Sequence, residues 1–136
     1  MELLLFKILN TAIERNLNNE MSDIGLTYTQ ATVIGYLKRN MEKEVCQKDI
    51  EYNLGLTHPT VSSILNRMEK SGMIYTEPLA SDHRYKKIKP TEKAIRCSEI
   101  IHEKIEKIKE QLFEGITSEQ EEILSMAVKR MIQNIS

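Results

Sequence analysis

The most informative chemistry in this sequence lies on one polar helix face. Residues 57–74 read THPTVSSILNRMEKSGMI, in which apolar residues recur at helical spacing. The side opposite that stripe holds small hydroxyls, an amide and basic groups, whereas a solvated helix face is normally filled with Glu and Lys. Short side chains that donate and accept hydrogen bonds let a helix approach base edges in the major groove of DNA. The stretch therefore indicates a helix that reads DNA.

Helical spacing sorts the residues of this stretch onto two sides. Val61, Ile64, Leu65 and Met68 fall together and are expected to face the core. The polar side would also suit an exposed helix that meets only water, so a further feature is needed to separate the two interpretations. The side chains expected to contact DNA lie in the first turn and on the outward face, namely Thr57, His58, Pro59, Thr60, Ser62, Ser63, Asn66, Arg67 and Lys70.

That further feature is a basic segment, SDHRYKKIK, at residues 81–89. It carries four lysines and arginines against one acid, in a chain whose formal net charge is only -1. A basic hairpin tip beside a groove-reading helix can enter the minor groove or clamp phosphates. We expect Arg84, Lys86 and Lys87 to contact DNA, and Asp82 to pair with Arg84 and hold the loop in shape.

The elements that position these residues follow from the spacing of apolar side chains. A helix, a short turn with a glycine and a second helix, followed by a hairpin, form a winged helix-turn-helix. Helical spacing predicts helices up to about residue 21, over 27–40, 46–53 and 57–71, from 91 to about 115, and from 117 onward. Alternating spacing predicts strands at 73–79 and 84–89, joined by a polar turn at 80–83.

Local sequence signals predict several of these boundaries. Residues 27–30 and 117–120 both have Thr followed three positions later by Gln, which is typical of a capping box at a helix start. Gly55 stands where a left-handed residue ends a helix. Thr57 is placed to act as an N-cap, and Pro59 fits the first helical turn because it lacks an N–H that would need a partner.

We predict a mainly α fold in which residues 1–136 form one winged helix-turn-helix domain. Residues 27–90 are the DNA-binding region with its small β-hairpin wing, and residues 1–25 and 91–136 are helices of a dimerisation region. The first and last helices carry more apolar surface than a small winged helix can cover. A second copy of the chain is the expected partner for that surface.

Composition and motifs exclude several other classes of protein. No stretch approaches the ~20 apolar residues of a membrane span, and two cysteines without a secretion signal indicate free thiols and a cytoplasmic protein. His58, His83 and His102 are isolated from one another, which argues against a metal site. No nucleophile with a base and no glycine-rich phosphate loop is visible, so we expect neither an enzyme nor a cofactor.

Cys46 has two interpretations. It stands at a predicted helix start, where aligned N–H groups can stabilise a thiolate, so it is a candidate oxidant sensor. The alternative is a small, half-buried packing residue.

The sequence resembles the multiple-antibiotic-resistance regulator (MarR) family of bacterial winged helix-turn-helix regulators over nearly its full length. The matching motifs are LTYTQATVIGYL, CQKDIEYNLGL, THPTVSSILNRMEKSGMI, the D-x-R of the wing, and PTEKA. The resemblance implies a two-fold dimer, recognition helices in successive major grooves and wings in flanking minor grooves. It also implies that Arg84 reaches DNA, that Asp82 braces it, and that Arg67 matches the arginine near the end of the recognition helix. Ala94 departs from the family pattern, which has Gly there.

The resemblance further implies an effector pocket between the first, second and post-wing helices. The residues expected to line it are Leu9, Ile13, Tyr36 and Ile101.

The function predicted from these features is sequence-specific regulation of transcription. The protein would act as a homodimeric, ligand-responsive repressor on a pseudo-palindromic operator of double-stranded DNA, with a small-molecule effector and no membrane partner. Two alternatives remain open: a winged-helix protein-interaction module that does not read DNA, and a cysteine-based redox-sensing regulator.

Overall fold

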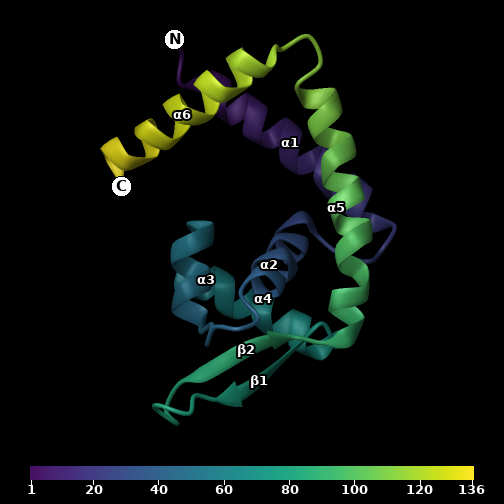
Figure 1. Ribbon diagram of the computed structural model, residues 1–136, viewed down its shortest axis with the longest axis vertical. Helices are drawn as coiled ribbons and strands as arrows, with labels where there is room; N and C mark the ends of the chain where they lie inside the picture. The colour runs from purple at the N-terminus through teal and green to yellow at the C-terminus, as the bar shows by residue number, and fades with distance from the viewer. The chain divides into compact units, whose positions relative to one another are not determined.

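The computed structural model describes residues 1–136 and contains six helices and one two-stranded antiparallel sheet. The mainly α fold with a β-hairpin wing that the sequence predicts is confirmed (Figure 1). The elements in chain order are α1 (Leu4–Ser22), α2 (Tyr28–Arg39), α3 (Gln47–Leu54), α4 (His58–Lys70), β1 (Ile74–Pro78), β2 (Lys86–Pro90), α5 (Glu92–Leu112) and α6 (Ser118–Ile135).

Both predicted capping boxes are present. At the start of α2, Thr27 Oγ1 accepts from the backbone N–H of Gln30, and Gln30 Oε1 accepts from the backbone N–H of Thr27, both at 3.1 Å. Thr117 and Gln120 make the same pair of hydrogen bonds before α6. Each box satisfies two N–H groups that the helix leaves unpaired.

Residues 1–104 and residues 105–136 form two compact units. In the first unit α3 packs against α4, with Gly55 between them in the left-handed conformation at φ 64°. That turn makes α3 and α4 the helix-turn-helix. The hydrophobic core of the first unit consists of Leu17, Met21, Leu26, Ala31, Val33, Ile34, Leu37, Val45, Ile50, Val61, Leu65, Met68, Met73, Ile74, Ile88, Ala94 and Ile101.

Both wing strands are shorter than predicted, and the second also lies further along the chain. The pairs run from Ile74 opposite Pro90 to Pro78 opposite Lys86. The predicted second strand began at Arg84. The backbone N–H of Tyr85 donates to the Asp82 carbonyl at 3.1 Å, so Arg84 and Tyr85 belong to the turn and not to the strand. The polar connection is therefore longer than the four residues predicted, because its own hydrogen bonds compete with strand pairing.

The root of the wing is tied to the loop before α3. The backbone N–H of Ile88 donates to the carbonyl of Val45 at 2.7 Å. Lys89 Nζ donates to the carbonyl oxygens of Met41 and Lys43, so this lysine caps the loop and is not available to a partner. These contacts fix the direction in which the hairpin leaves the winged helix (Figure 1).

Helices α1 and α6 each keep several large apolar side chains exposed. On α1 these are Leu4, Leu5, Ile8 and Leu9. In the second unit no residue of α6 is buried, and its exposed apolar side chains include Ile123, Leu124, Met126, Met131, Ile132 and Ile135. No helix of the structure combines the length and apolar character needed to cross a membrane.

Candidate nucleic-acid interface

Helix α4 has the two faces that its sequence predicts. Val61, Leu65 and Met68 are buried, with no more than 8% of any of them exposed. Ser63 and Asn66 are exposed on the other side. Thr60, Arg67 and Lys70 are exposed as well, whereas Ser62 and Ile64 are half-buried. The amphipathic character of the helix is therefore confirmed, and its short polar side chains face solvent.

The start of α4 differs from the prediction in one detail. Thr57 occupies the N-cap position, but its side chain makes no capping hydrogen bond to the backbone. Its hydroxyl instead donates to Thr60 Oγ1 at 2.9 Å. Pro59 offers one physical reason, since an N-cap oxygen accepts from the N–H of the second or third helical residue and proline at the second position has none.

The wing tip holds the predicted pair of Asp82 and Arg84. The guanidinium Nη2 lies 2.9 Å from Oδ2 and Nε lies 3.1 Å from Oδ1, so the pair is bidentate. The side-chain and backbone hydrogen bonds from Arg84 lower the pKa of Asp82 below its ordinary value of 3.8. The side-chain bond also raises the pKa of Arg84. Both groups thus stay charged near neutral pH.

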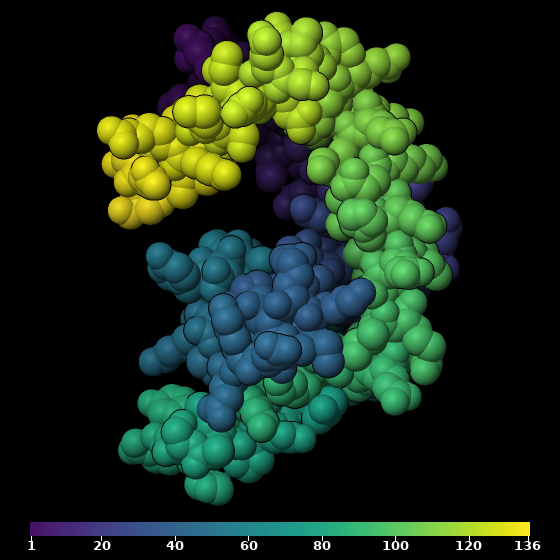
Figure 2. Space-filling model, in the orientation of Figure 1, coloured from purple at the N-terminus to yellow at the C-terminus, as the bar shows by residue number.

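The remaining basic residues of the wing are not equivalent. Lys86 is exposed. Lys87 lies opposite Glu77 in the sheet, and its Nζ is 3.2 Å from Glu77 Oε2 with the lysine side chain 24% exposed. Because this cross-strand pair occupies its ammonium group, Lys87 is less available to DNA than the sequence suggests. In the space-filling view the wing forms a separate ridge at the lower edge of the first unit (Figure 2).

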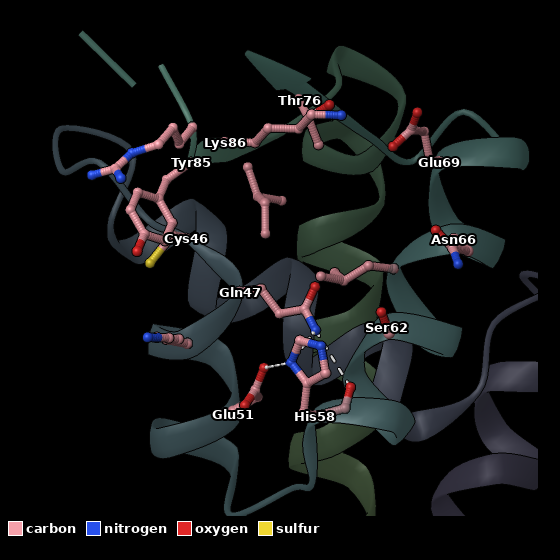
Figure 3. Close-up of a pocket in the computed structure, with 14 residues that line it drawn as sticks. Cys46, Gln47, Glu51, His58, Ser62, Asn66, Glu69, Thr76, Tyr85 and Lys86 are labelled. Atoms are coloured by element: carbon pink, nitrogen blue, oxygen red, sulfur yellow. Dashed lines mark hydrogen bonds and ion pairs between the residues drawn. The ribbon is translucent and has the colours of Figure 1, made fainter. Parts of the chain in front are cut away.

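Helix α4, the wing and the start of α3 line a surface hollow of about 390 Å³. Figure 3 shows Ser62 and Asn66 reaching it from α4, and Tyr85 and Lys86 from the wing. His58 and Arg84 line it as well. The structure therefore brings together five of the residues that the sequence singles out for DNA contact: His58, Ser62, Asn66, Arg84 and Lys86.

Arg67 lies apart from this hollow. It lines a second hollow, of about 520 Å³, whose other walls come from α1, from the start of α2 and from Ile64. None of Leu9, Ile13, Tyr36 and Ile101, which the family resemblance implies for an effector pocket, lines either hollow. Ile101 is buried and Leu9 is exposed, while Ile13 and Tyr36 are half-buried.

A cluster at the start of α4 escapes sequence reasoning. His58 Nδ1 lies 2.7 Å from Glu51 Oε2, and the amide nitrogen of Gln47 lies 3.0 Å from the same ring atom. These residues are seven and eleven positions apart, so no periodicity within one helix connects them. The Gly55 turn, which folds α4 back onto α3, is the signal that could have placed them together.

Cys46 occupies the N-cap position of α3 and is half-buried. Its thiol donates to Asp49 Oδ2 at 3.3 Å, and the same carboxylate oxygen accepts from the Cys46 backbone N–H at 2.9 Å. The Asp49 carboxylate therefore satisfies the backbone N–H at the start of α3 and also binds the thiol. Cys97 is also free and half-buried, and no group of three or more His, Cys, Asp or Glu side chains in the structure could hold a metal ion.

Charge is distributed unevenly along the chain. Residues 27–90 contain ten lysines and arginines against seven aspartates and glutamates, although the whole chain carries a formal net charge of -1. The winged helix-turn-helix is thus locally positive, as a surface that meets a polyanion requires.

Comparison with known proteins agrees with this geometry. A model of the MarR family matches residues 24–84. The structure of the transcription regulator MarR from Oenococcus oeni PSU-1 is 32% identical, covers 95% of this chain and 96% of that chain, and superposes with a TM-score of 0.80. The chain belongs to the MarR family.

Other solved MarR-like structures share the fold. The S. aureus MepR-DNA complex is 23% identical, covers 97% of this chain and 94% of that chain, and has a TM-score of 0.88. S. aureus MepR in its DNA-binding conformation is 24% identical, with coverage of 98% and 97% and a TM-score of 0.85. Members of the MarR family are regulators of transcription and not enzymes, and this chain is accordingly a MarR-family regulator.

Proposed function

We propose that this protein is a transcriptional repressor that binds a pseudo-palindromic DNA operator as a homodimer and is released by a small-molecule effector. The observation that carries the proposal is the hollow between α4 and the wing. Short polar side chains of the helix and basic side chains of the hairpin converge there. Such a surface suits a duplex because the helix can reach base edges while the wing holds phosphates.

The residues divide into two roles. Ser63 and Asn66 are exposed on α4, and their hydroxyl and amide groups can discriminate between bases by hydrogen bonding. Arg84 and Lys86 are exposed on the wing, where positive charge supplies affinity without sequence information. Arg67 and Lys70 extend the same positive character along α4.

Homodimerisation is supported by the apolar side chains that α1 and α6 each leave exposed. On α6, 67% of Ile123 and 56% of Ile132 is accessible to solvent. Contiguous exposed apolar surface of this kind marks an interaction site, and a two-fold dimer covers the same patch on both copies. We assign residues 1–25 and 91–136 to this dimerisation region and residues 27–90 to DNA binding.

Two-fold symmetry sets the geometry of the operator. Two identical reading heads require half-sites about 10 base pairs apart, or a multiple of that spacing, so that both helices face the same side of the duplex. The effector would act by favouring a conformation in which the two heads no longer match this spacing.

Selection from random oligonucleotides tests the proposal. The purified protein should enrich a pseudo-palindrome, and footprinting should protect both half-sites. Ser63→Ala and Asn66→Ala should change the enriched sequence more than they change affinity for unrelated DNA, since base contacts specify and phosphate contacts position. Lys70→Ala serves as the matched control on the same helix and should leave the motif intact. Enrichment of no motif, or protection of one asymmetric half-site by a single chain, would contradict the proposal.

A further inference from the structure

Glu51 and His58 form an ion-pairing contact at the start of the recognition helix. Oε2 of Glu51, on α3, lies 2.7 Å from Nδ1 of His58, on α4. The glutamate side chain is 20% exposed, whereas the imidazole is 70% exposed. Figure 3 shows the two side chains meeting at the edge of the hollow that Ser62 and Asn66 also line. The acid is therefore covered and the ring that it holds is accessible.

The chemistry of the two groups fixes the position of one hydrogen. An ionised carboxylate can only accept, so Nδ1 of His58 carries a hydrogen and donates it to Glu51. Gln47 Nε2 lies 3.0 Å from this nitrogen and 3.4 Å from the His58 carbonyl oxygen. It donates to the carbonyl, because a protonated Nδ1 has no lone pair to accept a hydrogen bond. Nε2 of the imidazole has no partner within the chain, and it is the atom left to meet a ligand.

An acid at this place is otherwise unfavourable. A carboxylate beside a DNA-facing surface repels phosphates. In the wing this repulsion is offset, because the carboxylate of Asp82 holds the guanidinium of Arg84 in place. Glu51 stands in the same relation to His58. In the imidazolium form each ring nitrogen carries a hydrogen, so Nε2 is then a charged donor suited to a phosphate oxygen.

We propose, on the basis of the DNA-binding function above, that Glu51 is a positioning residue that holds His58 with its Nε2 directed at a backbone phosphate. The contact is independent of base sequence, because a phosphate oxygen is present at every step of the duplex. It adds a contact from the start of α4 to those of the wing.

A double-mutant cycle tests this assignment. Affinity for a random-sequence duplex of about 30 base pairs, long enough for two half-sites, is measured by fluorescence anisotropy for the wild type, Glu51→Gln, His58→Gln and the double variant. His58→Gln should weaken binding by about fivefold to tenfold. Glu51→Gln should weaken it about threefold, although it removes a negative charge. In the His58→Gln background, Glu51→Gln should cause no further loss, because Glu51 acts only through the ring.

Glu69 provides the matched control. It lines the same hollow and is exposed, but it makes no ion pair with a basic side chain. Glu69→Gln should strengthen DNA binding slightly, and equally in the wild type and in the His58→Gln variant. This change measures the effect of removing one negative charge alone. A Glu51→Gln variant that behaved like Glu69→Gln, or that lost affinity equally with and without His58, would overturn the assignment.

The pH profile gives a second readout. Wild-type affinity should be about fivefold higher at about pH 6 than at about pH 8, because only the imidazolium form can donate through Nε2, and His58→Gln should lose most of that difference. His83→Gln, which alters the wing turn outside the hollow, should keep it. A rise that persists in His58→Gln would contradict the proposal. The other titratable groups that line the hollow are Cys46, Lys48, Glu51, Glu69, Arg84, Tyr85 and Lys86.

Folding and function are separated by two further checks. Thermal unfolding of all variants identifies any that are destabilised, and Glu51→Asp, whose shorter acid retracts from the ring, replaces Glu51→Gln if that variant unfolds. Glu51→Asp should then also lose affinity only when His58 is present. Wild-type protein that binds no duplex in dilute salt would refute the DNA-binding function itself, whereas binding that is insensitive to both substitutions would refute only the roles of His58 and Glu51.

Discussion

Asp82 holds Arg84 by three hydrogen bonds at the tip of the wing. The guanidinium donates through Nε and Nη2 at 3.1 and 2.9 Å, and the backbone N–H of Arg84 donates to Oδ1 at 3.1 Å. The arginine side chain nevertheless remains 84% exposed. The acid therefore restricts the direction of the guanidinium without covering it, which reduces the ordering that a DNA contact would require.

Removing either partner should weaken DNA binding. Arg84→Ala should cost about 1 to 3 kcal/mol of binding free energy at every sequence tested, because it removes a charged contact between the wing and the DNA backbone. Asp82→Asn should also weaken binding, because an unbraced arginine must be ordered on contact, even though an acid has been removed. Gel shifts on one selected duplex and one unrelated duplex measure both effects.

The control for this pair is Glu77→Gln. It removes an acid from the wing but releases Lys87, so it should leave affinity unchanged or raise it slightly. Asp82→Asn giving the same increase as Glu77→Gln would show that Asp82 only repels DNA.

The pair should also be insensitive to pH over the physiological range. Arg84 lowers the pKa of Asp82 below 3.8, so the stabilisation from this pair is present above that ordinary value. It is lost only as the pH falls through the lowered pKa. Titration of the Asp82 carboxyl carbon by NMR should show a midpoint below the ordinary value of 3.8. A midpoint at or above that value would mean that the brace is absent in solution.

Sequence reasoning succeeded where the signal is local. A capping box needs only Thr27 and Gln30, three residues apart, and the pair of Asp82 and Arg84 spans a single turn. The polar and apolar sides of α4 follow from the helical period alone. These features depend on neighbours along the chain, so the sequence carries them almost completely.

The contacts that escaped prediction depend on tertiary structure. Glu51 meets His58 only because α3 and α4 fold together, and Lys87 meets Glu77 only in the particular register of the hairpin. Predicting that register requires correct strand boundaries. The hydrogen bonds of the wing turn place the start of β2 at Lys86, two residues after the predicted start at Arg84. Side chains that appear free in the sequence are thus already paired in the fold.

The inward face of α4 should control stability. Met68 is fully buried, so Met68→Ala should lower the free energy of unfolding by about 2 to 5 kcal/mol through lost burial and a residual cavity. Lys70→Ala, on the exposed side of the same helix, should change it by less than about 0.5 kcal/mol. Urea denaturation followed by circular dichroism compares the two. Equal destabilisation by both variants would be inconsistent with the orientation of α4.

The exposed face of α6 should control oligomeric state. Ile132→Glu places a charge on the apolar surface that the proposed dimer buries, and a desolvated, unpaired carboxylate there is costly. Sedimentation should show the wild type as a dimer and Ile132→Glu shifted toward the monomer at micromolar concentration. Gln133→Glu, an exposed neighbour outside the apolar side chains named above, is the control and should remain dimeric. A dimer unaffected by Ile132→Glu would place the interface elsewhere.

The central claim is that the polar face of α4 and the basic wing together bind duplex DNA. Its most direct test is the affinity of the wild-type protein for a selected duplex as a function of salt. Displacement of counterions from the phosphates predicts a loss of at least about a hundredfold between about 50 and 200 mM salt. Arg84→Ala should make that dependence less steep. Absence of binding in dilute salt, or an affinity that salt does not change, would contradict the claim.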